Sequence, residues 1–571
     1  MKTLSSKFFP YLLVFGLALV VRLAAHSFWL ESPFTEYHLI NGLDMMTHMR
    51  FGLDFANGNA NFSLHKLLCW GMIKLSGEQF PVKELILFQH LIGSLVPVFV
   101  MHISLRMSGD KFLGILAGLL TALYSPLVMY ESFPLVESLF LFVSAAALLV
   151  SLSASPTKPL LLMLSGAIIV LPATVRFSGI FLSSALGIWF ALRLMRKKNS
   201  IDNKKFIKTV GIFLAGSVLA AALVGLINFI NSGELSFFPG KPVVSYIFKS
   251  GSQMKINPED DLGAWSAGLS DYSLERKAAS YLSKVIDLIR PYEIPNNLNY
   301  YFVKNQFPIL KYLIGPLLLI PMGVSGLLVS LARPSKARRF SIMFFYFIAI
   351  AAPMIVFLPL ARYRLALVPF FAFFAAYYIS SIGRFLRTSQ ERPMPLLLSL
   401  LTYVVVLTWS APSSFPLRSE DFLAYGEAIT HKKGNEEEIL LSYLAAYGIS
   451  PESRSVVSHL ADHLMNIGNF VEAKNILEKY CNKYNDASIK TMLAASMLGV
   501  GDFFGGRNVL LSIPEPKDGK ARVNHFYQLG EASRLMGNKD EALLYYETAL
   551  RATDDESQSK IIKSAIERLG L

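Results

Sequence analysis

The stretch Leu360-Ala361-Arg362-Tyr363-Arg364-Leu365 places two arginines between two strongly apolar segments of the chain. The connection is too short to carry both guanidinium groups far into water. An arginine in or beside a membrane core costs free energy unless an anionic group lies against it. This turn therefore predicts a membrane protein in which arginines meet an anion.

The composition also indicates a membrane protein. The 571 residues are 53% hydrophobic with a mean hydropathy of +0.43, and long apolar runs recur through the first two thirds of the chain. A soluble core does not need runs of about 20 apolar residues, which is the length that crosses a bilayer. We predict an all-α, polytopic protein with about eleven transmembrane helices, at residues 8–28, 84–106, 111–130, 135–152, 159–175, 177–194, 206–231, 308–332, 340–360, 365–383 and 394–411.

Lysine and arginine are distributed unevenly over the connections between these spans. If the N-terminus is cytoplasmic, most basic connections fall on the cytoplasmic side, as the positive-inside rule requires. The outer side then receives the loops 29–83 and 232–307, the turn at Arg362 and everything after about residue 412. We expect a multi-pass protein with a cytoplasmic N-terminus and an extracytoplasmic C-terminal domain.

The net charge of +13 follows this topology. Residues 1–411 hold 36 basic and 19 acidic side chains, whereas residues 412–571 hold 18 and 22. The excess therefore lies at the membrane, and we expect no nucleic-acid partner. The two cysteines, Cys69 and Cys481, show neither a disulfide framework nor a metal-ligand spacing. No metal site is predicted, no nucleotide-binding motif is present, and a divalent metal stays an unsupported alternative.

The chain changes character after residue 411, and we divide it there into a transmembrane domain, 1–411, and a helical domain, 412–571. A repeat with a spacing of 33 residues aligns Leu460-Ala461, Gly468, Ala473, Leu477 and Tyr480 with Leu493-Ala494, Gly501, Gly506, Leu510 and Ile513. A third copy runs Leu529-Gly530, Gly537, Ala542, Tyr546 and Ala549. The pattern resembles tetratricopeptide repeats over residues 453–552, in which a glycine caps the first helix of each pair. A further helical pair is expected at 420–448.

Polar residues at the outer ends of the spans are the candidates for chemistry. Asp44 precedes an amphipathic segment that would hold it near the membrane surface. Glu137 begins an apolar run, where a carboxylate is costly unless it faces a polar cavity. Glu131 and Arg176 lie at outer turns of the same kind. A shared polar chamber is the first interpretation; solvated carboxylates and an arginine that extends toward lipid headgroups are the alternative.

Several of these stretches resemble the C superfamily of membrane glycosyltransferases. The resemblance covers residues 8–385 and rests on Arg362-Tyr363-Arg364-Leu365 with the apolar run to Tyr377, on Leu123 through Glu131 and Glu137-Ser138-Leu139-Phe140, on Arg176-Phe177-Ser178-Gly179, and on Asp44 in the first outer loop. The chain looks like a bacterial relative of the dolichyl-phosphate-mannose protein mannosyltransferases (glycosyltransferase family 39-like). Two departures stand out: Phe177 occupies the usual proline position, and Asp44 is followed by Met45 rather than a second acidic residue.

The resemblance implies an inverting sugar transfer at the outer face of a bacterial inner membrane. A polyprenyl-phosphate-linked sugar would be the donor, and a protein, lipid or glycan the acceptor. Asp44 would act as general base and Glu137 would orient it, while Arg362, Arg364 and Arg176 would hold the donor phosphate. Glu131, His65, Lys66 and Tyr363 are further candidates for contacts to the substrate. The repeats would bind a partner or acceptor, or stabilise the outer loops.

Three other functions remain open on the sequence. An O-antigen-ligase-like or polymerase-like enzyme would share the outer arginines but use a polyprenyl-diphosphate donor. A transporter would show two related halves, which the sequence lacks. A non-enzymatic membrane scaffold would act through the repeats alone.

Overall fold

The computed structural model divides the chain into two compact units, Met1–Pro416 and Leu417–Leu571. The sequence-based boundary lies five residues earlier, at 411/412. The structure describes residues 2–57, 62–155, 157–196, 203–233, 235–237, 274–356, 360–388, 393–410, 417–517 and 519–570. Much of the predicted outer loop 232–307 lies outside these ranges.

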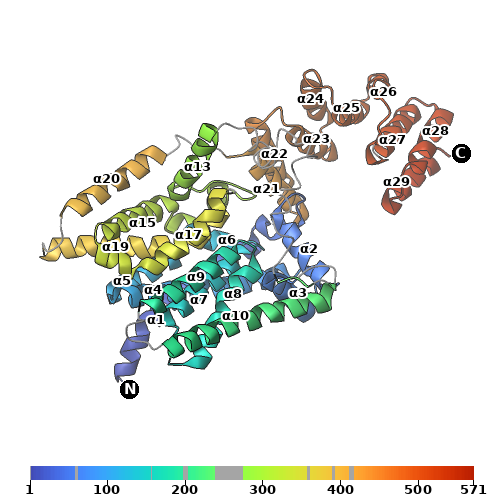
Figure 1. The fold of residues 1–571 in the computed structure, drawn as a ribbon. Helices are drawn as coiled ribbons and strands as arrows, with labels where there is room; N and C mark the ends of the chain where they lie inside the picture. The colour runs from blue at the N-terminus through green and yellow to red at the C-terminus, as the bar shows by residue number, and fades with distance from the viewer. Residues whose placement is uncertain are drawn as a thin grey trace. The chain divides into compact units, whose positions relative to one another are not determined.

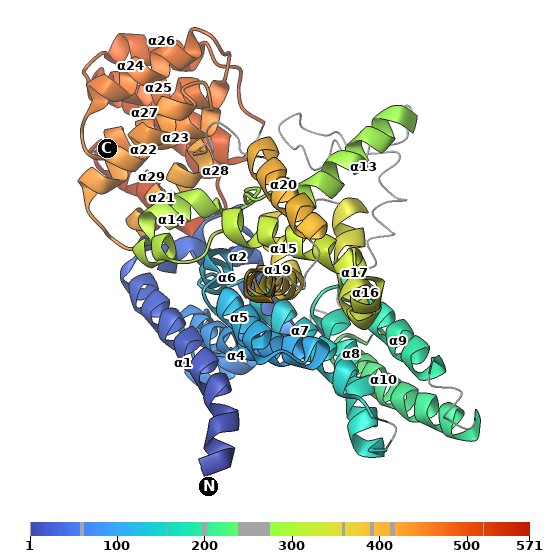
Figure 2. The same ribbon diagram turned by 90° about the vertical axis from the view of Figure 1, so that its left-hand side faces the viewer.

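The first unit is built from helices, and Figures 1 and 2 show two views of it. Its elements are α1 (Lys2–Glu31), η1 (Pro33–Leu39), α2 (Asp44–Ala56), α3 (Leu64–Ser76), α4 (Val82–Ser108), α5 (Lys111–Ala122), α6 (Ser125–Glu131), α7 (Glu137–Ser153), α8 (Pro159–Val175), α9 (Gly179–Met195), α10 (Asn203–Ser232), α13 (Leu274–Ile289), α14 (Tyr300–Gln306), η3 (Pro308–Tyr312), α15 (Pro316–Leu331), α16 (Pro334–Arg339), α17 (Ser341–Val356), α18 (Ala361–Arg364), η4 (Leu365–Leu367), α19 (Val368–Thr388) and α20 (Pro393–Ser410).

Among the described residues, four helical segments are long and apolar enough to cross a membrane: Phe8–Glu31, Val82–Ser108, Lys204–Asn231 and Ala361–Arg387. The prediction of about eleven spans is therefore wrong by this measure. The structure contains shorter apolar helices instead, at Lys111–Ala122, Glu137–Ser153, Pro159–Val175, Gly179–Met195, Pro316–Leu331, Ser341–Val356 and Ser399–Thr408.

Local sequence explains why two of these helices are short. The predicted span 111–130 divides because α5 ends before Tyr124, where the backbone pairs with Ile314 instead of continuing the helix. The next helix restarts with Pro126 in its first turn, a position that proline favours. At the end of α8, Arg176 adopts an extended backbone conformation and ends that helix. Polar turns thus interrupt the apolar sequence.

Helix α19 forms the centre of the first unit. Its residues Phe370 to Ala376 are almost completely buried, and α15, α5 and α17 pack against it. Glycine allows α15 to approach closely, because a β-carbon at Gly326 would overlap the carbonyl oxygen of Phe374. The Arg362 turn therefore belongs to the most buried of the four membrane-length segments, Ala361–Arg387.

A buried ion pair fixes the turn between α6 and α7. Arg22 of α1 contacts Glu131 with a shortest N–O distance of 2.7 Å, and both side chains are at most 1% exposed. Arg22 also donates hydrogen bonds to the carbonyl oxygens of Ala18 and Ala122. Gly93 of α4 makes room for the pair, since a β-carbon there would overlap the Glu131 carboxylate. The pair holds the turn that leads into Glu137.

The second unit is a series of paired helices, which confirms the prediction of a helical repeat. It comprises α21 (Ser419–His431), α22 (Glu436–Ile449), α23 (Arg454–Asn466), α24 (Phe470–Cys481), α25 (Ala487–Gly499), α26 (Phe503–Leu511), α27 (Gly519–Leu535), α28 (Lys539–Arg551) and α29 (Glu556–Glu567). Gly468, Gly501 and Gly537 have φ values of 82°, 88° and 85° and follow the first helix of their pairs. These are the predicted left-handed caps. The additional pair expected at 420–448 is α21 with α22.

The contact between α8 and α10 generates a prediction on stability. A β-carbon at Gly216 of α10 would overlap the carbonyl oxygen of Met163 in α8, whereas nothing lies within 4 Å of one at Gly211. We expect Gly216→Ala to destabilise the protein by about 1–3 kcal/mol, because the two helices must separate. Thermal unfolding in detergent measures the effect, with Gly211→Ala on the same helix as control. Equal unfolding temperatures for the two variants would contradict the close contact.

Candidate functional site

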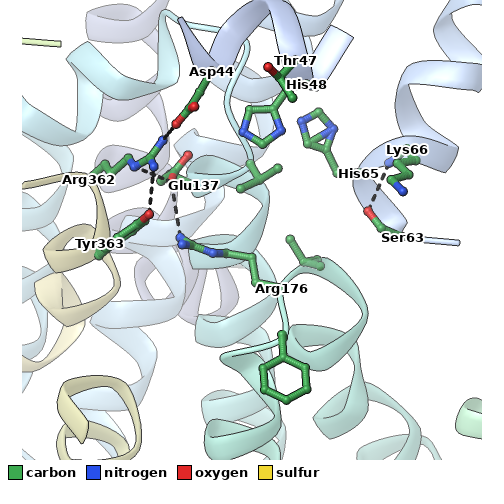
Figure 3. A pocket seen from close by; sticks show the side chains of 13 residues that line it. Asp44, Thr47, His48, Ser63, His65, Lys66, Glu137, Arg176, Arg362 and Tyr363 are labelled. Atoms are coloured by element: carbon green, nitrogen blue, oxygen red, sulfur yellow. Dashed lines mark hydrogen bonds and ion pairs between the residues drawn. The ribbon is translucent and has the colours of Figure 1, made fainter. Parts of the chain in front are cut away.

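A cavity of about 420 Å³ lies among α2, α3, α7, α18 and the turn between α8 and α9. In Figure 3 a cluster of side chains from separate elements meets at one side, His48 and His65 lie beside each other, and Ser63 and Lys66 lie farther away; the cluster consists of Asp44, Glu137, Arg176, Arg362 and Tyr363. The predicted site residues other than Arg364 and Glu131 are all part of its lining, which consists of Asp44, Thr47, His48, Ser63, His65, Lys66, Val136, Glu137, Val175, Arg176, Phe177, Arg362 and Tyr363.

Charged groups alternate along one wall of this cavity. The Arg362 guanidinium donates a hydrogen bond to the carboxylate of Asp44 and lies 3.8 Å from Oε1 of Glu137. The same Oε1 atom accepts a hydrogen bond of 3.3 Å from Arg176. Two carboxylates therefore alternate with two guanidinium groups along this wall.

The ring of Tyr363 supports both guanidinium groups. Its centroid lies 4.4 Å from the guanidinium carbon of Arg176 and 4.8 Å from that of Arg362. Its hydroxyl oxygen also accepts a hydrogen bond of 2.8 Å from Arg362. Cation–π contacts orient an arginine without consuming its hydrogen-bond donors. Tyr363 therefore positions Arg176 in a way that leaves its donors available to an anion.

Glu137 combines burial with an unused hydrogen-bond acceptor. It begins α7, where the helix dipole favours a negative charge, and its side chain is 3% exposed. Its Oε2 atom is buried and has no hydrogen-bond partner among the described residues. Because buried polar atoms are seldom left unpaired, this oxygen is the natural acceptor for a ligand hydroxyl.

Arg362 controls the ionisation of Asp44. Burial alone raises the pKa of this carboxyl group, but the nearby Arg362 charge and hydrogen bond outweigh it, so the net pKa is below the ordinary value. The Asp44 side chain is 37% exposed, and the carboxylate remains accessible from the cavity. Asp44 is therefore ionised at neutral pH.

Two stacked histidines form the opposite wall. The rings of His48 in α2 and His65 in α3 have centroids 5.5 Å apart with an interplanar angle of 22°. Burial lowers the pKa of His48 to about 4 and that of His65 to about 3. Nδ1 of His65 lies 3.2 Å from the Cys69 sulfur, while its Nε2 is buried and has no hydrogen-bond partner among the described residues. Both rings are neutral at physiological pH.

Lys66 lies beside this histidine wall. Burial lowers the pKa of its ammonium group, and Asp54 opposes that shift. Its backbone N–H donates to the Ser63 hydroxyl, which caps α3. No group of three His, Cys, Asp or Glu side chains able to hold a metal ion occurs in the described part of the chain.

Arg364, which the sequence predicts as a ligand for the donor phosphate, lies outside the lining of this cavity. Its side chain is 3% exposed and contacts Glu293 at 2.9 Å. It also donates hydrogen bonds to the carbonyl oxygens of Asp287, Arg290 and Tyr292. Residues two positions apart on a helix point in nearly opposite directions. The short helix α18 therefore directs Arg362 to the cavity and Arg364 to the segment between α13 and α14.

Glu131, a further candidate for contact to the substrate, also lies outside the lining of this cavity. Its carboxylate is neutralised by Arg22 and also lies 3.8 Å from Nδ1 of His90. With 1% of its side chain exposed, it cannot contact a substrate in this arrangement. Its role in the structure is to hold the turn before Glu137.

Sequence reasoning missed several residues of these networks. The position of His48 beside Asp44 is predictable from the sequence, because His48 follows Asp44 by four residues and so shares its face of α2. The role of Glu293 is not predictable from the sequence, because this residue lies in a long predicted loop without a recognisable pattern. Arg22 lies within the predicted span 8–28, but its partner Glu131 is 109 residues away.

Comparison with known proteins yields matches of low similarity, and these are to solved structures. No family model matches the chain, and no curated protein matches it. Among solved structures, it is similar to the crystal structure of the P58(IPK) TPR domain, with 9% sequence identity and a TM-score of 0.17. The match covers 67% of this chain and 96% of that one. A TM-score this low carries no argument, so the description of the repeats rests on their own helices and glycine caps.

The two arginines of the turn are expected to differ in their effect on stability. Arg364→Gln leaves Glu293 buried without its charge partner, and we expect it to destabilise the protein by about 3–5 kcal/mol. Arg362→Gln should cost less, because Arg176 still pairs with Glu137 and Asp44 is partly exposed. Thermal unfolding of the two purified variants measures the difference. A larger loss for Arg362→Gln would contradict the assignment of the two side chains.

The buried histidines predict a pH dependence of stability. The folded pKa of His48, about 4, lies below its ordinary value of 6.5, so the unfolded chain binds more protons between these values. The contribution of His48 to the free energy of unfolding is therefore fully present above pH 6.5 and is lost as the pH falls toward 4. His48→Gln should flatten this part of the unfolding profile, whereas His431→Gln, at an exposed residue, should not. An unchanged slope in His48→Gln would show that folding does not lower the pKa of His48.

Proposed function

We propose that this chain is a membrane glycosyltransferase that moves a sugar from a polyprenyl-phosphate donor to an acceptor at the outer face of a bacterial inner membrane. The acceptor is a protein, a lipid or a glycan. The observation that carries the proposal is the Asp44–Arg362 ion pair in a cavity that Arg176 and Glu137 also line. It supplies a base and an anion site in contact with each other.

The position of the cavity supports a lipid-linked substrate. Glu137 lies at the first residue of the apolar helix α7, and Arg176 directly follows the apolar helix α8. Arg362 begins the span Ala361–Arg387. Charged groups at the ends of apolar helices suit a donor whose polyprenyl chain lies in the membrane and whose phosphate lies at its surface. The predicted charge asymmetry assigns this end to the outer side.

The reaction is a single displacement at the anomeric carbon. An acceptor hydroxyl oxygen forms a bond to this carbon as the bond from the carbon to the phosphate oxygen breaks. The acceptor proton passes to the Asp44 carboxylate, and polyprenyl phosphate leaves with one additional negative charge. Arg362 and Arg176 stabilise this developing charge through charge-assisted hydrogen bonds. The displacement inverts the anomeric configuration.

The ion pair couples donor binding to the strength of the base. A donor phosphate that binds Arg362 competes with Asp44 for the guanidinium group. Asp44 then loses part of the interaction that lowers its pKa, and its carboxylate becomes a stronger base. The free Oε2 of Glu137 is available to a hydroxyl of the sugar or acceptor. Arg362 thus serves both as phosphate ligand and as regulator of Asp44.

Removal of the base should stop transfer without unfolding the chain. We expect Asp44→Asn to reduce sugar transfer at least about 100-fold, which is the usual contribution of general acid–base catalysis. The assay follows labelled sugar from polyprenyl-monophosphate donors to cell-envelope acceptors in proteoliposomes. The control is Asp54→Asn, at an exposed position of the same helix α2 that does not line the cavity.

Assays with monophosphate and diphosphate donors separate this proposal from its alternatives. Turnover restricted to diphosphate donors would favour the ligase-like or polymerase-like enzyme. Full activity of Asp44→Asn would remove the base from the mechanism. If no donor is used, and deletion of 453–552 rather than Asp44→Asn abolishes the cellular phenotype, the scaffold function replaces the enzyme.

A further inference from the structure

A second basic cavity occurs in the first unit, apart from the site around Asp44. Its volume is about 570 Å³, and it lies where α4, α7 and α9 end and α17 begins. Five arginines contribute to its lining: Arg106, Arg193, Arg196, Arg338 and Arg339. They come from three separate parts of the sequence, so their convergence is a property of the fold.

Within the described part of the chain, no carboxylate forms an ion pair with these arginines. Like charges that share one cavity repel one another, and the cost falls when an anion binds between them. The positive-inside rule accounts for basic residues on this side of a membrane. It does not account for five guanidinium groups around one cavity.

Hydrogen bonds hold part of the cavity wall in place. Arg193 donates to the carbonyl oxygens of Ser151 and Leu152 at 3.2 and 3.1 Å, and its guanidinium carbon lies 5.4 Å from the Trp189 ring centroid. The indole N–H of Trp189, which is 8% exposed, donates to the Ser341 hydroxyl at 3.1 Å. The wall is therefore preorganised.

This cavity and the one around Asp44 lie at opposite ends of the same helix. Glu137 begins α7 and Leu152, in the wall of the basic cavity, lies near its end. At 1.5 Å per residue the two are about 22 Å apart along the helix axis. With Asp44 at the outer side, the basic cavity lies at the inner side of the membrane.

Exposed apolar residues accompany the arginines on α9. Ile188, Leu192 and Met195 are 55%, 37% and 54% exposed. Each precedes by one position Trp189, Arg193 or Arg196, so an apolar stripe runs beside the polar one. An acyl chain can lie along the first stripe while a phosphate contacts the second.

We propose that this cavity binds the phosphate head group of an anionic phospholipid of the inner leaflet. Basic pockets between helices on the cytoplasmic side of membrane proteins suit such head groups. Arginine binds phosphate through paired N–H donors, and the exposed stripe of α9 favours a lipid over a soluble anion. The site depends on the membrane orientation given above and not on the sugar transfer.

Binding to the full-length chain tests the site. The delipidated protein in detergent is titrated with dioctanoyl phosphatidic acid, dioctanoyl phosphatidylcholine and inorganic phosphate, and native mass spectrometry counts the bound molecules. We expect phosphatidic acid to bind most tightly. The double substitution Arg338→Gln/Arg339→Gln, at two exposed residues, should weaken its binding about tenfold or more, because charge-assisted hydrogen bonds are lost.

Lys336→Gln is the matched control, because Lys336 is an exposed cation of the same helix α16 that does not line the cavity. It should leave phosphatidic acid binding unchanged. Equal weakening in the control, or unchanged binding in the double variant, would overturn the site. Inorganic phosphate that binds as tightly as phosphatidic acid would overturn the lipid assignment. Since the readout is binding, loss of the proposed transferase activity would not affect the result.

Discussion

The ion pair between Asp44 and Arg362 joins two parts of the chain that are 318 residues apart. It connects the amphipathic helix α2 to the turn before the buried helix α19. A charge at the end of an apolar helix requires either water or a partner. Here the partner is also the base of the proposed reaction. The cavity, the ionisation of Asp44 and the proposed competition by phosphate all depend on this contact.

The requirement that a charge near an apolar helix has a partner is met by two groups of ion pairs in the first unit. Arg22 with Glu131 and Arg364 with Glu293 are pairs in which both side chains are at most 3% exposed. They hold the turns that carry Glu137 and Arg362. Asp44, Arg362 and Arg176 retain contact with the cavity. Membership of the cavity lining, rather than position in a motif, distinguishes the ion pairs available to a ligand from the structural ones.

The sequence was sufficient to predict the class of fold and part of the site. Gly468 and Gly501, which are 33 residues apart, and Gly537 in the third copy predicted the helix caps of the second unit, because few other residues adopt positive φ there. Apolar runs located helices correctly but overestimated the length of several, since hydropathy does not detect the backbone break at Tyr124. The convergence of Asp44, Glu137, Arg176 and Arg362 followed from their expected side of the membrane. The burial of Arg364 depended on Glu293, whose distant contact no local pattern predicts.

In the proposed mechanism, Arg362 exchanges Asp44 for the phosphate of a lipid-linked sugar. Cryo-electron microscopy of the chain with a polyprenyl phosphonate sugar, in which carbon replaces the bridging oxygen at the anomeric centre, can observe this exchange. We predict the phosphonate within hydrogen-bond distance of Arg362 and Arg176, with the anomeric carbon directed toward Asp44 and the Asp44–Arg362 contact weakened. A bound phosphonate away from Arg362, with the Asp44–Arg362 pair unchanged, would contradict the proposed exchange.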